Sequence, residues 1–184
     1  GGNLFRYGTP GVDGFQAKVV TFENEMAERL GHKHVVATSS GTGSLMCCLA
    51  ALGIGMGDEV IVPGYTFIAS IATIAMMNAI PVLAEIDESL TIDPTKIEAL
   101  ITPKTKAIMI TNPGNPTGTC LTEAQMKMLL DVAVAHDLYL VADEVYREFT
   151  YDGEPLHSFG KFDYGQENLI LIDSVSKRFS ACGA

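Results

Sequence analysis

Basic residues are scarce in this chain of 184 residues, since 12 lysines and arginines stand against 22 acidic residues and the formal net charge is −10. Nucleic acids and anionic membranes attract proteins through basic surfaces, so this balance argues against both as partners. Hydrophobic residues make up 47% of the chain and charged residues 18%, a composition typical of a globular protein. The length allows one domain with a sizeable core.

Long apolar runs and paired cysteines are also missing. The stretch nearest to transmembrane length, 68–80, is interrupted by polar residues and is too short to span a membrane. The chain begins with Gly1-Gly2-Asn3, without a methionine or a signal peptide, so we expect it to be processed or excised from something longer. The four cysteines have neither metal-site spacing nor a disulfide framework, and we interpret them as reduced, core-type thiols of a cytoplasmic protein without a metal: Cys47, Cys48, Cys120 and Cys182.

Short apolar runs alternate with segments of helical periodicity. Residues 1–14 are rich in glycine and proline and predict an N-terminal arm, followed by one α/β domain over 15–184. Strands are predicted at 34–38, 59–62, 81–86, 107–110, 138–142 and 169–172. Helices are predicted at about 15–30, 44–52, 68–79, 94–101 and 122–136, with Gly31 ending the first and Thr122 capping the last. This alternation predicts a doubly wound, mostly parallel sheet in a three-layer α/β/α fold.

Candidate ligand-binding groups follow the early strands, at the edge where open α/β sheets bind ligands. Ser40-Gly41-Thr42-Gly43 precedes a helix, whose N-terminus offers free N–H groups to an anion. The segment matches neither the dinucleotide fingerprint nor the P-loop, so it is either a phosphate site or only a tight turn. Phe67 lies just beyond the second strand and either stacks on a planar ring or belongs to the core.

Three further candidates follow the later strands. Asn115 belongs to a turn with two prolines, whose rigidity either directs the amide at a ligand or is only structural. Asp143 ends a very apolar strand, with Tyr146 three residues later, and such a carboxylate needs a partner, either a ligand or a helix N-terminus. Lys177 follows the sixth strand behind Ser174 and is either a Schiff-base amine beside phosphate ligands or a surface lysine.

Together these residues place an anion-binding turn, an aromatic ring, an amide, a carboxylate, a phenol and a lysine at successive strand ends. Pyridoxal 5′-phosphate needs all of them, because it has a phosphate, a planar ring, a phenolic oxygen, a pyridine nitrogen and an aldehyde. We therefore predict pyridoxal 5′-phosphate as the cofactor. The four histidines have no ligand spacing and stay unassigned.

The C-terminal part resembles a known family. Asn115 to Gly118, Ala142 to Tyr146 and Ser174 to Gly183 resemble class I/II aminotransferases, which are fold-type-I pyridoxal-phosphate enzymes; the likeness covers about 104–184. It implies Lys177 as the lysine that forms the Schiff base and later shuttles a proton. It also implies Asp143 on the pyridine nitrogen, Tyr146 and Asn115 on the phenolic oxygen, and Ser174 on the phosphate.

The first 110 residues resemble another branch. Phe22 to Gly31, Gly57 to Pro63 and Thr66 to Ser70 are similar to DegT-like nucleotide-sugar aminotransferases. That likeness assigns Gly41, Thr42 and Gly43 to the phosphate and Phe67 to stacking on the ring. The two likenesses meet near 104–112, which predicts a chimera, natural or recombined from fragments. The family pattern implies that a phosphate-binding arginine, the last sheet strand and the small domain are missing from these residues.

The resulting hypothesis is a pyridoxal-phosphate-dependent aminotransferase, or its large cofactor domain, that moves an amino group from an amino acid to a keto acid or keto-sugar. Its catalytic residues would be Lys177, Asp143 and Tyr146. The family builds its site across a homodimer interface, which implies a homodimer here. Two alternatives stay open: a non-catalytic, truncated or recombined scaffold of aminotransferase origin, and a fold-type-I carbon–sulfur lyase. Whether these residues act as an enzyme by themselves is left open by the sequence.

Overall fold

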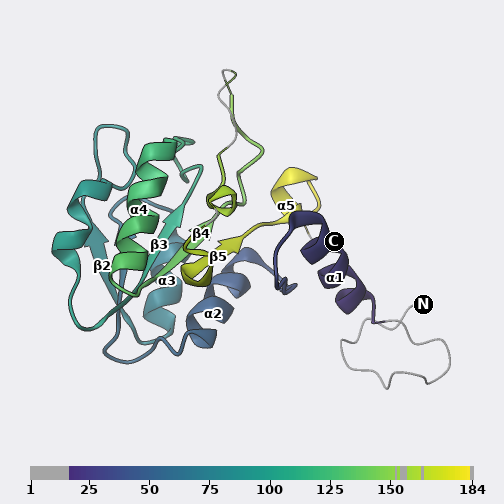
Figure 1. Cartoon of the computed structure of the whole chain (residues 1–184), viewed down its shortest axis with the longest axis horizontal. Coiled ribbons are helices and arrows are strands. Elements are labelled where there is room, and N and C mark those ends of the chain that lie inside the picture. The colour runs from purple at the N-terminus through teal and green to yellow at the C-terminus, as the bar shows by residue number, and fades with distance from the viewer. Residues whose placement is uncertain (1–16, 152, 154–156, 163, 183–184) are drawn as a thin grey trace. The chain divides into compact units, whose positions relative to one another are not determined.

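The computed structural model describes residues 17–151, 153, 157–162 and 164–182. The chain divides into two compact units, residues 1–39 and 40–184 (Figure 1). The N-terminal arm predicted over 1–14 lies outside the described residues.

The described part of the first unit contains the helix α1 (Lys18–Leu30). Gly31 ends this helix in the left-handed conformation, with φ of 68°, as the sequence predicts. The carboxylate of the buried residue Glu23 accepts a hydrogen bond from the Ala37 N–H at 2.8 Å and so ties the segment after the helix back to it. The predicted strand at 34–38 is wrong: a strand exists only by pairing, and no described segment pairs with these residues.

The second unit is built on a parallel sheet with the strand order β2-β1-β3-β4-β5. Its strands are β1 (Glu59–Pro63), β2 (Ile80–Ala84), β3 (Thr105–Thr111), β4 (Tyr139–Asp143) and β5 (Leu169–Ile172). Each neighbouring pair runs parallel. The inner strands β1, β3 and β4 are apolar and buried almost throughout, as expected for parallel strands covered on both faces. The other five predicted strands are therefore confirmed, with ends that shift by one or two residues.

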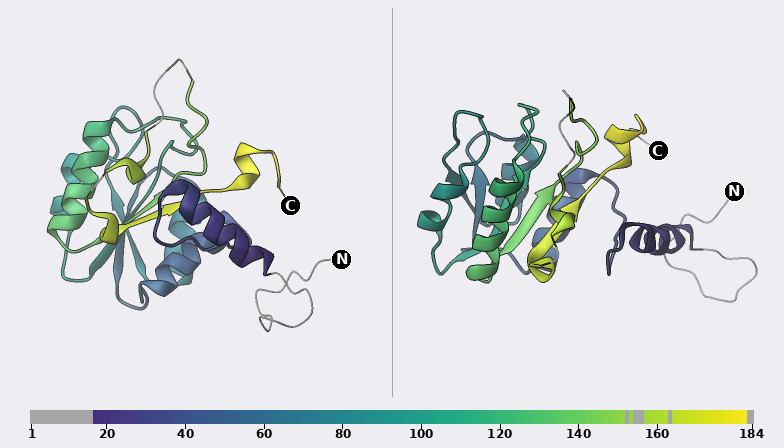
Figure 2. Two further views of the ribbon diagram at one scale, coloured as in Figure 1. Left: turned by 45° about the vertical axis from the view of Figure 1, so that its right-hand side comes forward. Right: turned by 45° about the horizontal axis from the view of Figure 1, so that its top comes forward.

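Helices cover both faces of this sheet (Figure 2). The helices α2 (Gly41–Ala51) and α3 (Ile68–Met76) pack on one face, over a core that includes Leu45, Leu49, Val60, Ile74, Met109 and Val141. The helix α4 (Glu123–Ala135) packs on the other, over a core that includes Ile61, Ile108, Met126, Leu129 and Leu140. This arrangement confirms the three-layer, doubly wound fold.

Short helical turns complete the unit. The helix predicted at 94–101 is two 3₁₀ turns, η1 (Pro94–Lys96) and η2 (Glu98–Leu100). Two more 3₁₀ turns, η3 (Phe159–Lys161) and η4 (Gln166–Asn168), precede β5, and the four-residue helix α5 (Val175–Arg178) follows it. None of the helices in the described ranges is long and apolar enough to cross a membrane.

The cysteines correct another expectation. All four lie in the described part of the chain, where Cys47 and Cys182 are exposed and Cys48 and Cys120 are half-buried, so they are not core-type thiols. Burial, with Cys47 adjacent, raises the pKa of the Cys48 thiol to about 11. Cys48 is therefore not activated as a thiolate nucleophile.

Candidate active site

The strands β3, β4 and β5 end at the same level of the sheet. The ladders pair Thr111 with Asp143, and Asp143 with Ile172. Side chains alternate between the two faces of a strand, and Met109 and Val141 belong to the core under α2 and α3. Thr111 and Asp143 therefore face the α2 and α3 side, at the carboxyl edge where parallel sheets bind ligands.

Asp143 is a buried carboxyl group at this edge. Its side chain accepts a hydrogen bond from the Val145 N–H at 3.2 Å, and no described lysine or arginine pairs with it. Burial raises its pKa to about 6, and the nearby carboxylate of Asp173 adds to this rise. The residues that follow form turns and no regular helix, which excludes the helix-cap alternative. A cationic ligand group beside Asp143 would offset the cost of ionising it.

Two buried hydroxyl groups lie on the same side of the sheet. Thr111 Oγ1, next to Asp143 in the ladder, and Ser70 Oγ, in the first turn of α3, have no hydrogen-bond partner among the described residues. Buried polar atoms are usually satisfied, so an unpaired one calls for an ordered water or a ligand. Sequence reasoning missed both residues, because an isolated serine or threonine carries no spacing signal.

The predicted phosphate-binding residues form the first turn of α2, which begins earlier than the sequence predicts. The hydroxyl of Ser40 accepts the Gly43 N–H at 3.0 Å. The N–H groups of Gly41 and Thr42 make no hydrogen bond within the described ranges. Free N–H groups and the positive end of the helix dipole suit an anion, so the phosphate site stays a prediction.

Phe67 occupies the N-cap position of α3 and is 43% exposed. The alternative that it is a core phenylalanine is therefore wrong. Its ring stands near the carboxyl end of β1, which finishes at Pro63, and is open to a planar ligand.

The turn after β3 separates the roles of its two asparagines. Asn112 is buried, and its side-chain oxygen accepts the Leu121 N–H at 2.9 Å, so this residue holds the turn to the start of α4. Asn115 is half-buried and its amide makes no hydrogen bond among the described residues. The bonds that both residues form to the following prolines are cis. Asn115 is thus the asparagine left available for a ligand.

The remaining predicted residues follow β4 and β5. Tyr146 is half-buried in the turn after β4, with its ring edge-on to Phe149 at 5.9 Å between centroids. Ser174 caps α5, where its hydroxyl accepts the Ser176 N–H at 3.1 Å. Lys177 lies within α5, and its exposed side chain makes no ion pair within the described part of the chain. Asn115, Tyr146 and Lys177 thus follow the aligned ends of β3, β4 and β5, whereas Phe67 follows β1 and the segment Gly41 to Gly43 begins α2.

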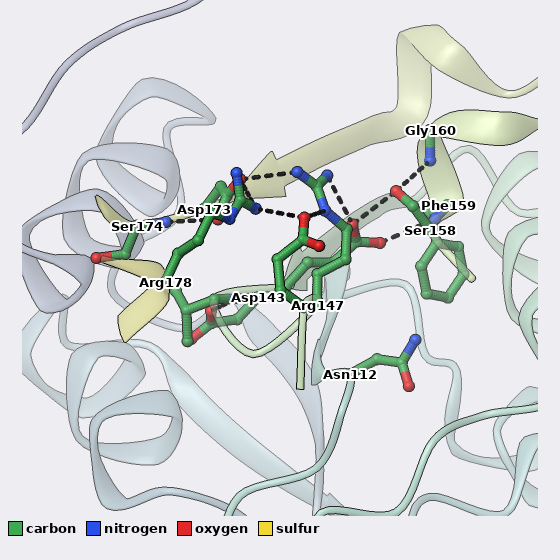
Figure 3. Close-up of polar contacts among 12 residues, drawn as sticks. Asn112, Asp143, Arg147, Ser158, Phe159, Gly160, Asp173, Ser174 and Arg178 are labelled. Atoms are coloured by element: carbon green, nitrogen blue, oxygen red, sulfur yellow. Dashed lines mark hydrogen bonds and ion pairs between the residues drawn. The ribbon is translucent and has the colours of Figure 1, made fainter. Parts of the chain in front are cut away.

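Four charged side chains that sequence reasoning did not single out follow the same two strands; Figure 3 labels three of them, Arg147, Asp173 and Arg178. We call them the charged ring: Arg147, Glu148, Asp173 and Arg178. Asp173 Oδ2 lies 2.9 Å from Arg147 Nη2 and 2.8 Å from Arg178 Nη2. Glu148 Oε1 lies 3.3 Å from Arg178 Nη2 and 3.8 Å from Arg147 Nε, which closes the ring. The only signal in the sequence is that acids and arginines follow two strands, and strand adjacency is a tertiary fact.

Glu144 anchors a further segment next to the ring. Its buried carboxylate accepts hydrogen bonds from the Ser158 hydroxyl at 2.6 Å and the Phe159 N–H at 2.8 Å. Arg147 Nη1 lies 3.6 Å away. Burial raises the pKa of Glu144, and these three partners oppose the rise. The residue therefore ties 158–159 to the end of β4.

Solved structures with this arrangement are pyridoxal-phosphate aminotransferases. The aromatic aminotransferase of Pyrococcus horikoshii is similar with a TM-score of 0.77 and 26% identity, over 87% of this chain and 46% of that one. The aspartate aminotransferase of Thermus thermophilus with maleate is similar with a TM-score of 0.77 and 28% identity, over 87% and 42%. The fold is thus the α/β fold of fold-type-I aminotransferases.

The DegT/DnrJ/EryC1/StrS aminotransferase family matches residues 15–162, and the chain belongs to this family. Curated relatives include an L-glutamine:2-deoxy-scyllo-inosose aminotransferase of Streptomyces kanamyceticus, 39% identical over 76% of this chain and 33% of the relative. Another is a GDP-perosamine synthase of Caulobacter vibrioides, 40% identical over 77% and 37%. The chain thus spans about a third of the length of these relatives.

Aminotransferases of this family and fold depend on pyridoxal 5′-phosphate, which agrees with the cofactor prediction. The family match continues through the expected seam at 104–112, whereas the solved structures are aromatic and aspartate aminotransferases. The chimera hypothesis stays a prediction. Among the described residues, no three histidines, cysteines or acids gather closely enough to hold a metal ion.

Proposed function

We propose that these residues form the cofactor-binding part of a pyridoxal-phosphate-dependent aminotransferase. The observation that carries the proposal is Asp143, a buried carboxyl group that no described lysine or arginine pairs with, at the same sheet edge as the Lys177 segment. A protonated pyridine nitrogen would supply the cation that Asp143 lacks. The hydroxyls of Ser70 and Thr111, which have no hydrogen-bond partner among the described residues, could bond a ligand at this edge.

The residues present fit the cofactor part by part. The first turn of α2, Gly41 to Gly43, and the hydroxyl of Ser174 would bind the phosphate. Phe67 would cover a face of the ring, and Asp143 would hold the ring nitrogen. Tyr146 and Asn115 would donate hydrogen bonds to the phenolic oxygen, since neither side chain has a hydrogen-bond partner among the described residues.

When bound, pyridoxal 5′-phosphate supplies an aldehyde that takes up an amino group and a ring that accepts electrons. The chain's own residues would position it and move protons. The Nζ of Lys177 would attach the cofactor and then carry the proton taken from the substrate α-carbon. The carboxylate of Asp143 would keep a positive charge on the ring nitrogen, an electrostatic role that is preorganised by the strand.

The family relatives favour a keto group on a sugar or cyclitol as acceptor. One relative is named for L-glutamine and 2-deoxy-scyllo-inosose, and another for GDP-perosamine. We therefore propose an amino acid such as glutamine as the donor and a cyclic polyol ketone as the acceptor. A keto acid is the alternative acceptor.

The first test is covalent labelling. The chain is mixed with pyridoxal phosphate, its visible absorption is recorded, and the complex is reduced with borohydride and mapped by mass spectrometry. We expect the label on Lys177, and we expect Lys177→Ala to lose both the label and the absorption band. The control is Lys127→Ala, which removes an exposed lysine of α4 and should keep both.

The outcomes separate the candidate functions. A label scattered over surface lysines contradicts the cofactor site and favours the non-catalytic scaffold. If Lys177 is labelled, conversion of the bound cofactor by L-glutamine, followed by transfer to a cyclic ketone, supports the aminotransferase. Release of a keto acid without an amino acceptor would instead identify a carbon–sulfur lyase.

We further propose that the chain works as a homodimer in the cytoplasm. Exposed apolar side chains at the two ends of α3 support the dimer, since Ile68, next to Phe67, is 69% exposed and Met76 is 62% exposed. Sedimentation at several concentrations tests this proposal, and a monomer at every concentration would contradict it. The low cysteine content without a disulfide framework supports a reducing compartment.

A further inference from the structure

The helix that carries Lys177 has little to hold it in place. α5 has only four residues, and none of them is buried. Its one apolar residue, Val175, is 49% exposed, and the following Phe179 is 67% exposed. A helix this short is not stable by itself, and tertiary packing normally supplies the stability. Here the apolar side chains are largely exposed, so we infer that polar contacts orient the helix.

Arg178 supplies these contacts from the position next to Lys177. Its Nη2 reaches both Asp173, at the end of β5, and Glu148, in the turn after β4. Its Nε is buried and has no partner among the described residues, so the Nη2 contacts make the attachment. The Arg178 side chain is only 21% exposed, which strengthens these pairs relative to pairs in water.

Asp173 joins the two segments that carry the candidate catalytic residues. Its Oδ1 accepts the Ser174 N–H at 2.7 Å, while its Oδ2 accepts from both Arg147 and Arg178 (Figure 3). Arg147 is next to Tyr146, and Arg178 is next to Lys177. The charged ring thus bridges the β4 turn and α5 through charge-assisted hydrogen bonds, the stronger kind.

We propose that Asp173 and Arg178, braced by Arg147 and Glu148, are positioning residues that orient α5 so that Lys177 is presented to the cofactor. The inference rests on the proposed function for the role of Lys177, whereas the orientation of α5 is a property of the cofactor-free chain. Because α5 is a single turn, fixing Arg178 fixes the orientation of the whole helix about its axis. It therefore also fixes the direction in which the Lys177 side chain leaves the helix.

Amide hydrogen exchange of the cofactor-free chain tests the attachment. Arg178→Met keeps most of the side-chain volume and removes the charge, and we expect exchange across 174–179 to quicken about tenfold. Asp173→Asn keeps an oxygen for the Ser174 N–H but loses the charge, and we expect a similar increase. Arg178→Lys should recover part of the protection, because one nitrogen makes both contacts of Arg178 and an ammonium group can replace it.

Two comparisons make the result decisive. Lys127→Met removes an exposed ion pair of 2.6 Å with Asp131 on α4 and should leave exchange across 174–179 unchanged. Exchange across β4, residues 139–143, should also stay slow in the ring variants. The inference is overturned if Arg178→Met and Asp173→Asn leave 174–179 unchanged. It is equally overturned if they quicken β4 as much as α5, since the effect is then global unfolding.

The second readout is the site of the borohydride-fixed label. In Arg178→Met we expect the share of label on Lys177 to fall about tenfold relative to the other lysines, with partial return in Arg178→Lys. If wild-type Lys177 is labelled and Arg178→Met keeps the same share, the positioning role is refuted. If wild-type Lys177 is not labelled at all, the proposed function fails, and hydrogen exchange alone then decides whether the ring orients α5.

Discussion

Replacing Asp143 with asparagine should stabilise the cofactor-free chain at neutral pH. Burial raises the pKa of this carboxyl from an ordinary value of 3.8 to about 6. Each unit of pKa difference between the folded and unfolded chain corresponds to about 1.36 kcal/mol, so the ionised carboxylate destabilises the folded chain by about 3 kcal/mol. The amide that replaces the carboxyl in Asp143→Asn would carry no charge and would keep an oxygen for the Val145 N–H.

The sign of the pH dependence follows from the direction of this shift. Below pH 3.8 the carboxyl is protonated in both states and costs nothing. As the pH rises from 3.8 to about 6, the unfolded chain loses this proton while the folded chain keeps it, so stability falls over that range and levels off above it. The advantage of Asp143→Asn should therefore grow between pH 4 and pH 7 and then level off.

Urea unfolding at pH 4, 6 and 8 measures this advantage. With a urea m-value of roughly 2 kcal/mol/M, a gain of about 3 kcal/mol moves the midpoint up by about 1.5 M at pH 8. Asp131→Asn is the matched control, because hydrogen bonding to Lys127 lowers the pKa of the Asp131 carboxyl. Loss of this carboxylate should therefore lower the stability of the chain slightly at pH 8. A difference between Asp143→Asn and wild type that stays the same at all three pH values would refute the reasoning.

Three further predictions concern local structure. Thr122→Ala removes the capping box of α4 and should cost about 1 kcal/mol in urea unfolding. Gln125→Ala loses the bonds that its amide side chain makes but keeps the bond from the Gln125 N–H to the Thr122 hydroxyl, so it should cost less. Gly165→Ala should cost about 2 kcal/mol, since the glycine has φ of +68° and a Cβ there would lie 2.8 Å from Leu130 Cδ1. Gly153 has φ of +74° but open space around a Cβ, so Gly153→Ala measures the cost of the backbone conformation without a steric clash. Equal losses of stability in the two variants would contradict a clash with Leu130. Glu144→Gln should speed exchange of the Phe159 amide several-fold, because a neutral oxygen is the weaker acceptor, whereas unchanged exchange would show that burial of Phe159 suffices.

The pattern of the sequence predicted the sheet where local signals agree with packing. Apolar runs such as 107–110 and 140–142 are buried in the sheet, so their hydrophobicity identifies β3 and β4. Thr122 with Gln125 and the glycine at 31 mark helix ends through local hydrogen bonds and backbone conformation, and both are where the sequence predicts. The run at 34–38 has the same local signal and forms no strand, because pairing is not a local property.

The candidate site divides in the same way. Asp143, Asn115 and Lys177 could be found from the sequence, since each stands just past an apolar run and strand ends collect at one edge of a parallel sheet. The charged ring could not, because Arg147 and Asp173 are 26 residues apart and meet only when β5 pairs with β4. The raised pKa of Asp143 likewise arises from burial under α2 and α3. The sequence by itself determined which chemical groups reach the carboxyl edge; the tertiary structure alone decided which of them are buried, paired or left free, because these properties depend on neighbours distant along the chain.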